Sequence, residues 1–432
     1  MKRLNAMLVA VSRTIIASAF WLATRLSNRV KVSGIQHDTG ASPAYLAMSH
    51  KRDLDPMVLV PTLLFHRGWR ALAGKVHFFL RGDAFSPGYL ARMVMRPRWL
   101  SYMLRRVLVG PALRWLGTHP ADSLQLPLEE WIREAIRIDG DGGKRRTGDA
   151  LAPSIIEEVA AATHESYERV ASQPLAHLLT WKYQHALQYV YGFEVLTGTT
   201  RRAAQKRAVE RIKQNLAELD AWLWRGGSLF ASAEGQLSPL GLLSPISTAF
   251  HRLMRAAPPE TSVVPIFLVY DFMTTQQLRI FVDLGPTIER APTLPPAELD
   301  AQLRERWLAA ATFTCTQLGS GFLAQASYSS LSSFTLQDLA SSIHAQAKSL
   351  AAAGRHVDQR LLDLRGARKR ARGFLKYAAR HNLVRCSAKQ AWTPTMNEAP
   401  LNLRPGEVGY DRAPFTYALN ELNEMLNFLQ FT

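Results

Sequence analysis

Short apolar runs alternate with helical stretches along most of the chain. Residues 154–225 and the chain after about residue 330 have helical patterns, and 417–428 form a last predicted helix. Four apolar runs have the length of a strand: 44–48, 229–233, 263–270 and 278–284. The alternating segment 30–32, closed by Gly34, predicts a further short strand. This alternation predicts the α/β class, with a mixed sheet flanked by helices.

The first 29 residues have the pattern of one amphipathic helix. Its apolar positions fall on a single stripe, with basic residues at both ends: Leu4, Leu8, Val11, Ile15, Leu22 and Leu26. Ser12 and Arg13 interrupt the apolar stretch, so the segment is a poor spanning helix. Two interpretations stay open. The helix lies in a membrane interface, or it packs on the protein's own core.

The charge of the chain narrows the class of partner. The 432 residues include 52 Lys and Arg against 35 Asp and Glu, which gives a net charge of +17. Such a balance indicates a polyanionic partner, which can be nucleic acid, an anionic lipid surface or a phosphorylated substrate. The two cysteines, Cys315 and Cys386, form no disulfide framework or metal-ligand spacing and favour a reducing, cytosol-facing compartment.

Two basic stretches could meet such a partner. Residues 92–116 mix arginines with Trp99, Tyr102 and Trp115. This mixture suits a nucleic-acid groove and a membrane interface equally, and a solvated helix face is the simplest alternative. The basic run at 365–380 has the simpler interpretation of a solvated helix face. No recognised nucleic-acid-binding module is present, so we expect no nucleic-acid partner.

The strongest chemical signal is a histidine that directly follows the predicted strand 44–48. His50 and Asp55 form an H-x-x-x-x-D pair, with Asp55 and Pro56 as the predicted N-cap and first residue of the next helix. A neutral imidazole can take a proton from a hydroxyl, and a carboxylate on its other nitrogen fixes the tautomer. No G-x-S-x-G nucleophile motif occurs, so the pair favours direct attack by a substrate hydroxyl on an acyl group. The alternative is a histidine that only buttresses its loop.

Four segments in order resemble the motifs of the glycerolipid acyltransferases, which include glycerol-3-phosphate and lysophosphatidic acid acyltransferases. Gly285-Pro286 also resembles the family's closing turn, and the similarity covers roughly residues 5–290. The four segments are Ser49-His50-Lys51-Arg52-Asp53-Leu54-Asp55-Pro56, Leu116-Gly117-Thr118-His119-Pro120, Phe230-Ala231-Ser232-Ala233-Glu234-Gly235 and Val264-Pro265-Ile266.

The resemblance implies roles for several residues. His50 would be the general base and Asp55 its orienting partner, while Glu234 and Gly235 would position the acceptor, with backbone N–H groups near Gly235 available to an oxyanion. Pro265 belongs to the fourth motif and is expected at the substrate site. The donor would be an acyl-CoA or acyl carrier protein thioester, and no metal or prosthetic group is implied.

The chain departs from the family where the acceptor's phosphate is bound. Ser123 and Leu237 stand where the family has arginines. Lys51, Arg52 or Arg81 could replace them, or the acceptor could carry no phosphate. We therefore expect a fatty acyl transferase of phospholipid biosynthesis, peripheral or monotopic on the cytoplasmic face of a membrane. The alternatives are an O-acyltransferase with a non-phosphorylated lipid acceptor and a non-catalytic membrane-surface protein on the same fold.

The spacing of the motifs also predicts a domain organisation. His50 and Glu234 are 184 residues apart, which is longer than usual for the family, so residues 125–200 are interpreted as a helical insertion. The expected organisation is a membrane-associating helix at 1–29, an acyltransferase domain at 30–330 and a helical C-terminal region at 331–432.

Overall fold

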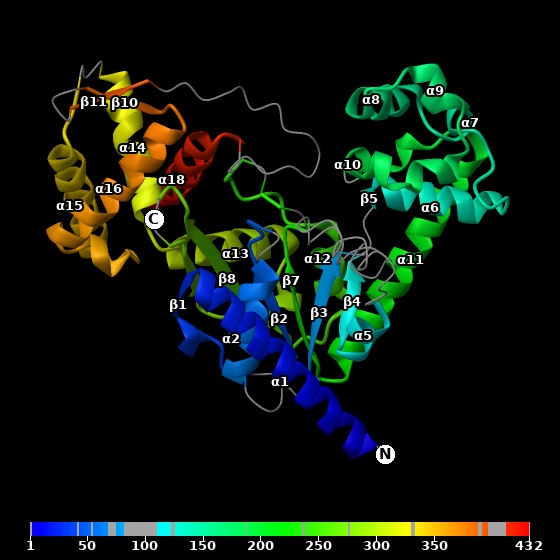
Figure 1. The fold of residues 1–432 in the computed structure, drawn as a ribbon. Helices are drawn as coiled ribbons and strands as arrows, with labels where there is room; N and C mark the ends of the chain where they lie inside the picture. Colours follow the sequence, from blue (N-terminus) through cyan, green and yellow to red (C-terminus); the bar gives the residue numbers. More distant parts are fainter. Residues whose placement is uncertain are drawn as a thin grey trace. The chain divides into compact units, whose positions relative to one another are not determined.

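A mostly parallel seven-stranded sheet flanked by helices forms the centre of the computed structural model (Figure 1). The structure describes residues 2–40, 43–52, 55–67, 75–81, 110–121, 126–187, 189–235, 237–238, 240–274, 277–329, 333–387, 391–395 and 412–431. The predicted α/β class, with a mixed sheet and flanking helices, is confirmed.

The strands are ordered β1-β9-β8-β2-β7-β3-β4. β8 and β9 are antiparallel, whereas β1 is parallel to β9 and β2 is parallel to both β7 and β8. Their bounds are β1 (Arg29–Ser33), β2 (Ala44–Met48), β3 (Val76–Arg81), β4 (Thr118–Ala121), β7 (Ser228–Ser232), β8 (Ser262–Asp271) and β9 (Arg279–Leu284).

The central strands are apolar because both of their faces are covered. Every residue of β2 and β8 is buried, as expected for strands with helices on both sides. Met48, the last residue of β2, pairs with Ser232 of β7 and with Ile266 of β8. The loops that follow β2 and β7 therefore leave the sheet at the same edge.

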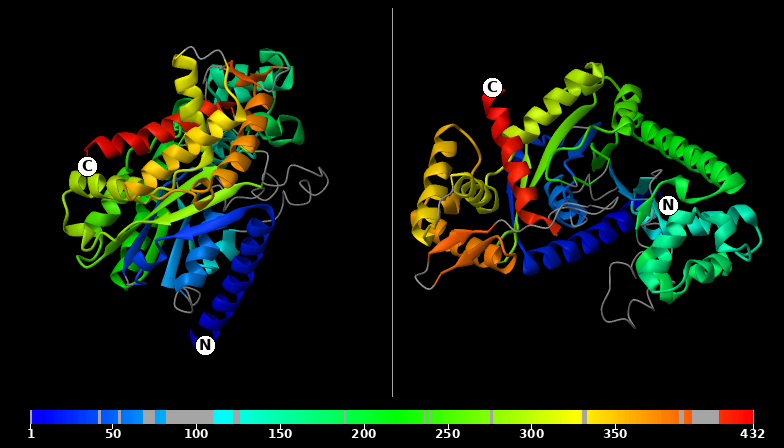
Figure 2. Two further views of the ribbon diagram at one scale, coloured as in Figure 1. Left: turned by 90° about the vertical axis from the view of Figure 1, so that its left-hand side faces the viewer. Right: turned by 90° about the horizontal axis from the view of Figure 1, so that it is seen from above.

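Two pairs of helices cover the two faces of the sheet (Figure 2). α1 (Lys2–Ser27) packs on α2 (Asp55–Arg67) over one face. α12 (Thr248–Ala256) and α13 (Pro296–Ala310) lie over the other. There the ring of Phe250 meets Tyr45 edge to face, and the indole of Trp307 donates to the Ala47 carbonyl at 3.1 Å.

The chain after β9 adds a helical layer to the same compact unit. α14 packs against α15, α16 and α18, and a short antiparallel hairpin of β10 and β11 follows α16. The bounds are α14 (Cys315–Tyr328), α15 (Leu336–Ala352), α16 (Leu364–Arg380), β10 (Val384–Cys386), β11 (Trp392–Pro394) and α18 (Pro414–Phe431).

The chain forms two compact units: the first holds residues 1–77, 222–403 and 407–432, and the second holds 78–221 and 404–406. The second unit has a core of its own, built around Trp131, Ile156 and Tyr183. This unit contains α5 (Gly110–Trp115) and the whole of the predicted insertion, 125–200. The insertion forms β5 (Leu126–Pro127), α6 (Leu128–Asp139), α7 (Thr147–Ala150), α8 (Pro153–Thr163), α9 (Tyr167–Ser172), α10 (Gln184–Leu187), β6 (Val190–Tyr191) and the start of α11 (Gly198–Trp224).

α1 turns its apolar stripe outward. Its exposed residues include every member of the stripe predicted from the sequence, namely Leu4, Leu8, Val11, Ile15, Leu22 and Leu26. The buried side of the helix instead carries Ala10, Arg13, Ala17 and Thr24, and the small residues allow close packing. The helix thus packs on the protein through its opposite side while the stripe stays exposed, and a location in a membrane interface stays a prediction. Residues 7–27 also have the length and composition of a spanning helix.

Candidate active site

The histidine loop follows β2 and ends at the start of α2, in the first compact unit. Ser49 fastens it to β8, since its backbone N–H donates to the Ile266 carbonyl at 2.9 Å and its hydroxyl accepts from the Leu268 N–H at 3.2 Å. His50 comes next, at the edge where parallel α/β sheets carry their reactive side chains.

The structure brings His50 and Asp55 together as predicted from the sequence. Nδ1 of His50 lies 2.9 Å from Oδ2 of Asp55. The His50 side chain is 14% exposed, while that of Asp55 is completely buried. When an ionised Asp55 accepts this hydrogen bond, the ring proton sits on Nδ1 and Nε2 keeps its lone pair. That arrangement is what a general base requires.

Asp55 is held by four donors. Its Oδ2 accepts from the backbone N–H groups of Lys51 at 2.7 Å and Arg52 at 2.9 Å, as well as from His50. The hydroxyl of Tyr270, at the end of β8, donates to Oδ1. The carboxylate therefore turns back to the histidine loop, and α2 begins at Asp55 itself. The Asp55 carboxylate therefore fixes the imidazole of His50 and does not act as the N-cap of α2 that the sequence predicted.

Glu234 braces the same loop from β7. Its side chain is 3% exposed, and its two oxygens accept the backbone N–H groups of His50 at 2.8 Å and Ser244 at 2.6 Å. Ser238 adds a further link, since its N–H donates to the His50 carbonyl at 2.8 Å. Burial raises the pKa of Glu234, and the positive charge of Lys51 opposes that rise. In this geometry Glu234 positions His50 through two backbone hydrogen bonds, and the acceptor contact that the resemblance implies stays a prediction.

Lys51 lies inside the protein. It is 1% exposed, and its Nζ is 3.4 Å from Oε1 of Glu421 on α18 and 3.4 Å from the Gly241 carbonyl. Glu421 is held in turn by the side-chain amide of Gln317 at 2.5 Å. Burial lowers the pKa of Lys51, but the surrounding carboxylates, Glu421 foremost, hold it above its ordinary value. Lys51 thus ties the histidine loop to the C-terminal helix.

Arg52 is the predicted phosphate ligand that lies beside His50 and keeps part of its surface in solvent. Its guanidinium stacks over the rings of Tyr270, at 4.7 Å from the centroid, and Phe272, at 5.2 Å. Such stacking holds a planar cation in place beside the histidine loop.

The remaining predicted site residues are placed differently. Gly235 is exposed at a φ of +72°, and a Cβ there would lie 3.0 Å from that of Ser247, so the turn requires glycine. Pro265 is buried within β8, opposite Ala47, and does not line an open site. Arg81 ends β3, but its side chain lies outside the described residues, as do Ser123 and most of 92–116. Leu237 is described and half-buried.

Two contributors to the site were not predicted from the sequence. Tyr270 closes a predicted strand, and its position at the strand's end was the signal that could have drawn attention to it. Glu421 lies 366 residues after Asp55 on the final helix, where no local pattern distinguishes it from a surface glutamate.

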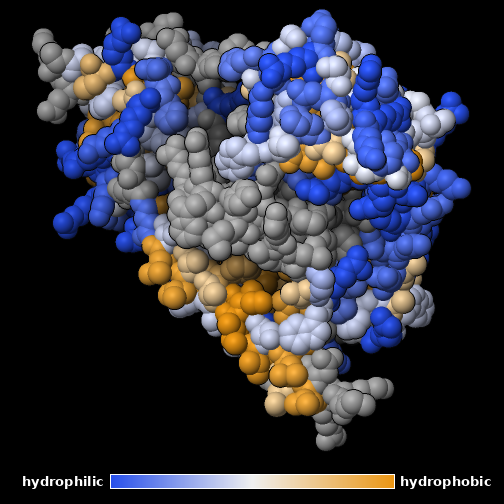
Figure 3. Space-filling view, turned by 45° about the vertical axis from the view of Figure 1, so that its right-hand side comes forward, coloured by the Kyte–Doolittle hydropathy of each residue, from blue (hydrophilic) through white to orange (hydrophobic). Residues whose placement is uncertain are grey.

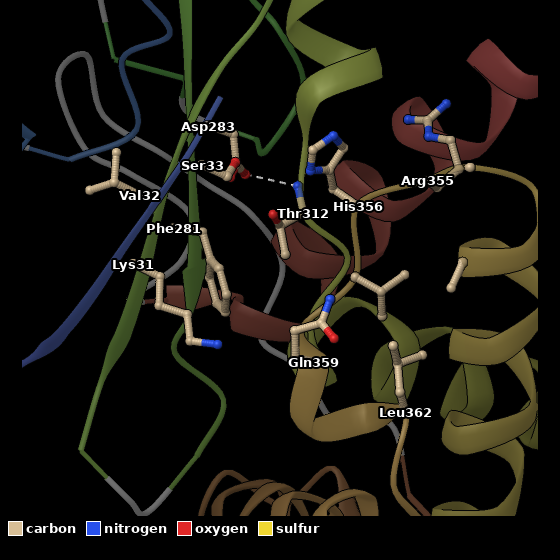
Figure 4. A pocket seen from close by; sticks show the side chains of 13 residues that line it. Lys31, Val32, Ser33, Phe281, Asp283, Thr312, Arg355, His356, Gln359 and Leu362 are labelled. Carbon is tan, nitrogen blue, oxygen red and sulfur yellow. Dashed lines mark hydrogen bonds between the residues drawn. The ribbon is translucent and has the colours of Figure 1, made fainter. Parts of the chain in front are cut away.

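Two further observations concern metal ions and cavities. Among the described residues, no group of three His, Cys, Asp or Glu side chains could bind a metal ion. A cavity of about 410 Å³ opens elsewhere in the first unit, between β1, β9 and the segment 351–362 (Figure 4), and none of the predicted site residues lines it.

The comparisons with known proteins add no family. No model of a protein family matches this chain, and no curated protein matches it either. The assignment of a function therefore rests on the residues of the site.

Proposed function

We propose that the protein is an O-acyltransferase that moves a fatty acyl group from a thioester to the hydroxyl of a glycerolipid-type acceptor, as in phospholipid biosynthesis. The observation that carries the proposal is the pairing of His50 Nδ1 with a buried, fully hydrogen-bonded Asp55. A loop that only needed a buttress would not require a partly exposed imidazole with one nitrogen free for a substrate proton.

The reaction needs only a base and a positioned thioester. Nε2 of His50 takes the proton of the acceptor hydroxyl as its oxygen attacks the thioester carbonyl carbon. Asp55 stabilises the imidazolium that forms. When the tetrahedral intermediate collapses, the C–S bond breaks, and the departing thiolate receives the proton from His50. The products are an ester and a free thiol, so no oxidant, metal or prosthetic group enters the balance.

The donor is proposed to be acyl-CoA or an acyl carrier protein, and the acceptor glycerol-3-phosphate or a lysophosphatidic acid-like lipid. Arg52 is the described cation best placed for the acceptor's phosphate, since Lys51 is buried against Glu421. Leu237 in place of the family's arginine supports the second candidate, an acceptor without a phosphate.

The direct test is to incubate the purified full chain, in lipid vesicles, with palmitoyl-CoA and one acceptor at a time. Release of free thiol and formation of the labelled ester are both measured. Acceptor-dependent release that yields the ester is the expected result. Transfer to diacylglycerol but not to phosphorylated acceptors would favour the second candidate. Absence of transfer from either palmitoyl-CoA or palmitoyl acyl carrier protein would favour the non-catalytic alternative.

Substitution of Arg52 tests the acceptor. Arg52→Gln is expected to raise KM for glycerol-3-phosphate roughly 10- to 100-fold, because a charge-assisted phosphate contact contributes about 1.5–3 kcal/mol. The rate with a non-phosphorylated acceptor should change little, and Arg52→Lys should restore only part of the affinity. An unchanged KM for phosphorylated acceptors would remove Arg52 from the site.

The proposed location is the cytoplasmic face of a membrane, with α1 lying in the interface. The space-filling view shows the apolar patch formed by α1 on the outer surface (Figure 3). A large exposed apolar patch is typical of a membrane or protein contact. Arg13 on the buried side of the same helix favours a helix that lies flat over one that crosses.

Exposed residues of α1 offer the test of this location. The triple change Leu8→Ser, Ile15→Ser and Leu22→Ser is expected to lower binding to vesicles at least about 100-fold, because each side chain loses the transfer of its apolar surface out of water. The matched control is Tyr328→Ser, which removes an 88% exposed apolar side chain from α14. Flotation with vesicles measures both, and equal binding of the triple variant and the wild type would contradict an interfacial α1.

A further inference from the structure

α16 carries a row of cations that nothing in the described structure neutralises. The 17 residues of this helix include no Asp or Glu. Six of its basic residues are exposed. Within the described ranges, five of these six form no ion pair or hydrogen bond: Arg365, Arg368, Arg372, Lys376 and Arg380. Their spacing of three or four residues places them on one stripe about 22 Å long.

The stripe weakens the helix that bears it. Arg368, Arg372, Lys376 and Arg380 follow one another at four-residue intervals, a spacing at which like charges repel. Arg365 stands in the first turn, where the helix dipole disfavours a cation. The buried cation of the same helix is treated differently, since Arg370 is paired with Asp271. Within the described ranges, the five cations of the stripe have no such ion pair.

An ordinary basic helix of this chain provides the contrast. α11 is also rich in Arg and Lys, but it contains Glu210, Glu218 and Asp220. Two of its arginines, Arg207 and Arg211, lie within 4 Å of the buried Glu134. Solvated surfaces usually mix the two signs in this way. The uniform sign on α16 is therefore unlike the mixed surface of α11.

The cations continue from α16 to the end of α1. In both views of Figure 2, α16 lies beyond the C-terminal end of α1. Arg360, in the turn before α16, is close enough to Arg29 and Lys31 for their charges to act on one another. Burial, then repulsion from Arg279 and Arg360, lowers the pKa of Lys31. Burial, then repulsion from Arg29, lowers the pKa of Arg360. Nζ of Lys31 also lies 3.8 Å from Oδ1 of the buried Asp358. Lys31 lines the open cavity next to this turn, on the side opposite Gln359 (Figure 4).

We propose that this cationic strip, defined as Arg29, Lys31, Arg360 and the five stripe cations of α16 (Arg365, Arg368, Arg372, Lys376 and Arg380), binds the phosphate groups of anionic phospholipids while α1 lies in the same bilayer. The inference rests on the interfacial location given under the proposed function and adds the lipid class and the surface that recognises it. A bilayer is favoured because the strip adjoins the exposed apolar stripe of α1. Anionic lipid satisfies both surfaces at once, whereas nucleic acid or an acidic protein satisfies only the charges.

The test compares two variants that lose the same charge. One replaces three cations of the strip, with Arg368→Gln, Arg372→Gln and Lys376→Gln. The other replaces three exposed cations of α11, with Arg202→Gln, Lys206→Gln and Lys213→Gln. Binding of the full chain is measured by flotation with phosphatidylcholine vesicles that contain either no phosphatidylglycerol or 40% of it, at low and high salt.

The strip variant is expected to lose about 100-fold in binding to anionic vesicles, at roughly fivefold per cation near the surface. Its binding to neutral vesicles should stay unchanged, and high salt should remove the difference from the wild type. The control should bind within about twofold of the wild type. The strip variant should be as thermally stable as the control, because its substitutions remove repulsion between like charges and break no contact.

Three outcomes would overturn the inference. The strip variant could bind anionic vesicles as tightly as the wild type, or the control could lose as much binding as the strip variant. The strip variant could also keep its preference for anionic vesicles and instead lose binding to an acidic protein or a DNA duplex. Acyl transfer to a water-soluble acceptor separates this inference from the proposed function. If the strip variant transfers acyl groups and binds vesicles like the wild type, the proposed function stands and the lipid-binding inference is wrong. If the protein shows no acyl transfer but needs the strip to bind anionic vesicles, the inference stands and the proposed function is wrong.

Discussion

His50→Ala is expected to reduce acyl transfer by about 10²–10⁴-fold while the protein stays folded, because the general base is lost and the imidazole is a minor part of the packing. The ring is partly exposed and makes its hydrogen bond to Asp55. Initial rates of ester formation, with circular dichroism melting as the fold control, measure the two effects separately.

Asp55→Asn extends this prediction to the orienting partner. An amide at this position can donate to Nδ1, which leaves the ring proton on Nε2, and that nitrogen can then no longer accept from the hydroxyl. We expect a loss in rate of the same order as for His50→Ala, and a double variant no slower than either single one. The matched control is His66→Ala, an exposed histidine at the other end of α2. A wild-type rate for either site variant would remove the pair from the chemistry.

Lys51→Met is expected to destabilise the folded chain by about 3–5 kcal/mol, since it leaves the buried Glu421 without its cation. Gln317 alone would then hold that carboxylate. The raised pKa of Lys51 means that its stabilising charge is fully present at neutral pH and is lost only as the pH rises through the folded-state pKa, in strongly alkaline solution. Urea unfolding at pH 7 measures the change.

The double variant Lys51→Met with Glu421→Leu is the informative control. Replacing a whole buried ion pair with apolar side chains is often neutral, so most of the lost stability should return. A ligand of the substrate's phosphate would behave otherwise: Lys51→Met would raise KM in a stable protein, and the change at Glu421 would rescue nothing. That result would restore Lys51 to the substrate site and contradict its structural role.

The sequence by itself determined the α/β class and the chemistry of one loop. Apolar runs at 44–48 and 263–270 became β2 and β8, because strands buried on both faces admit no polar alternation. His50 and Asp55 were recognisable because only four residues lie between them, a distance that a loop leading into a helix can close. The apolar stripe of α1 was also predictable, since a helical period of 3.6 residues places its members on one side of the helix.

Only the tertiary structure decided which charged residues face a substrate and which hold the fold. Lys51 and Arg52 are neighbours in the chain, but one is enclosed by Glu421 and Gly241 and the other stacks in partial solvent on Tyr270. Glu234 stands in a motif that suggested acceptor contact and instead accepts two backbone N–H groups. The partners of these residues come from β7, β8 and α18, far away in the sequence. Their burial and charge environment depend on long-range packing, which no local pattern encodes.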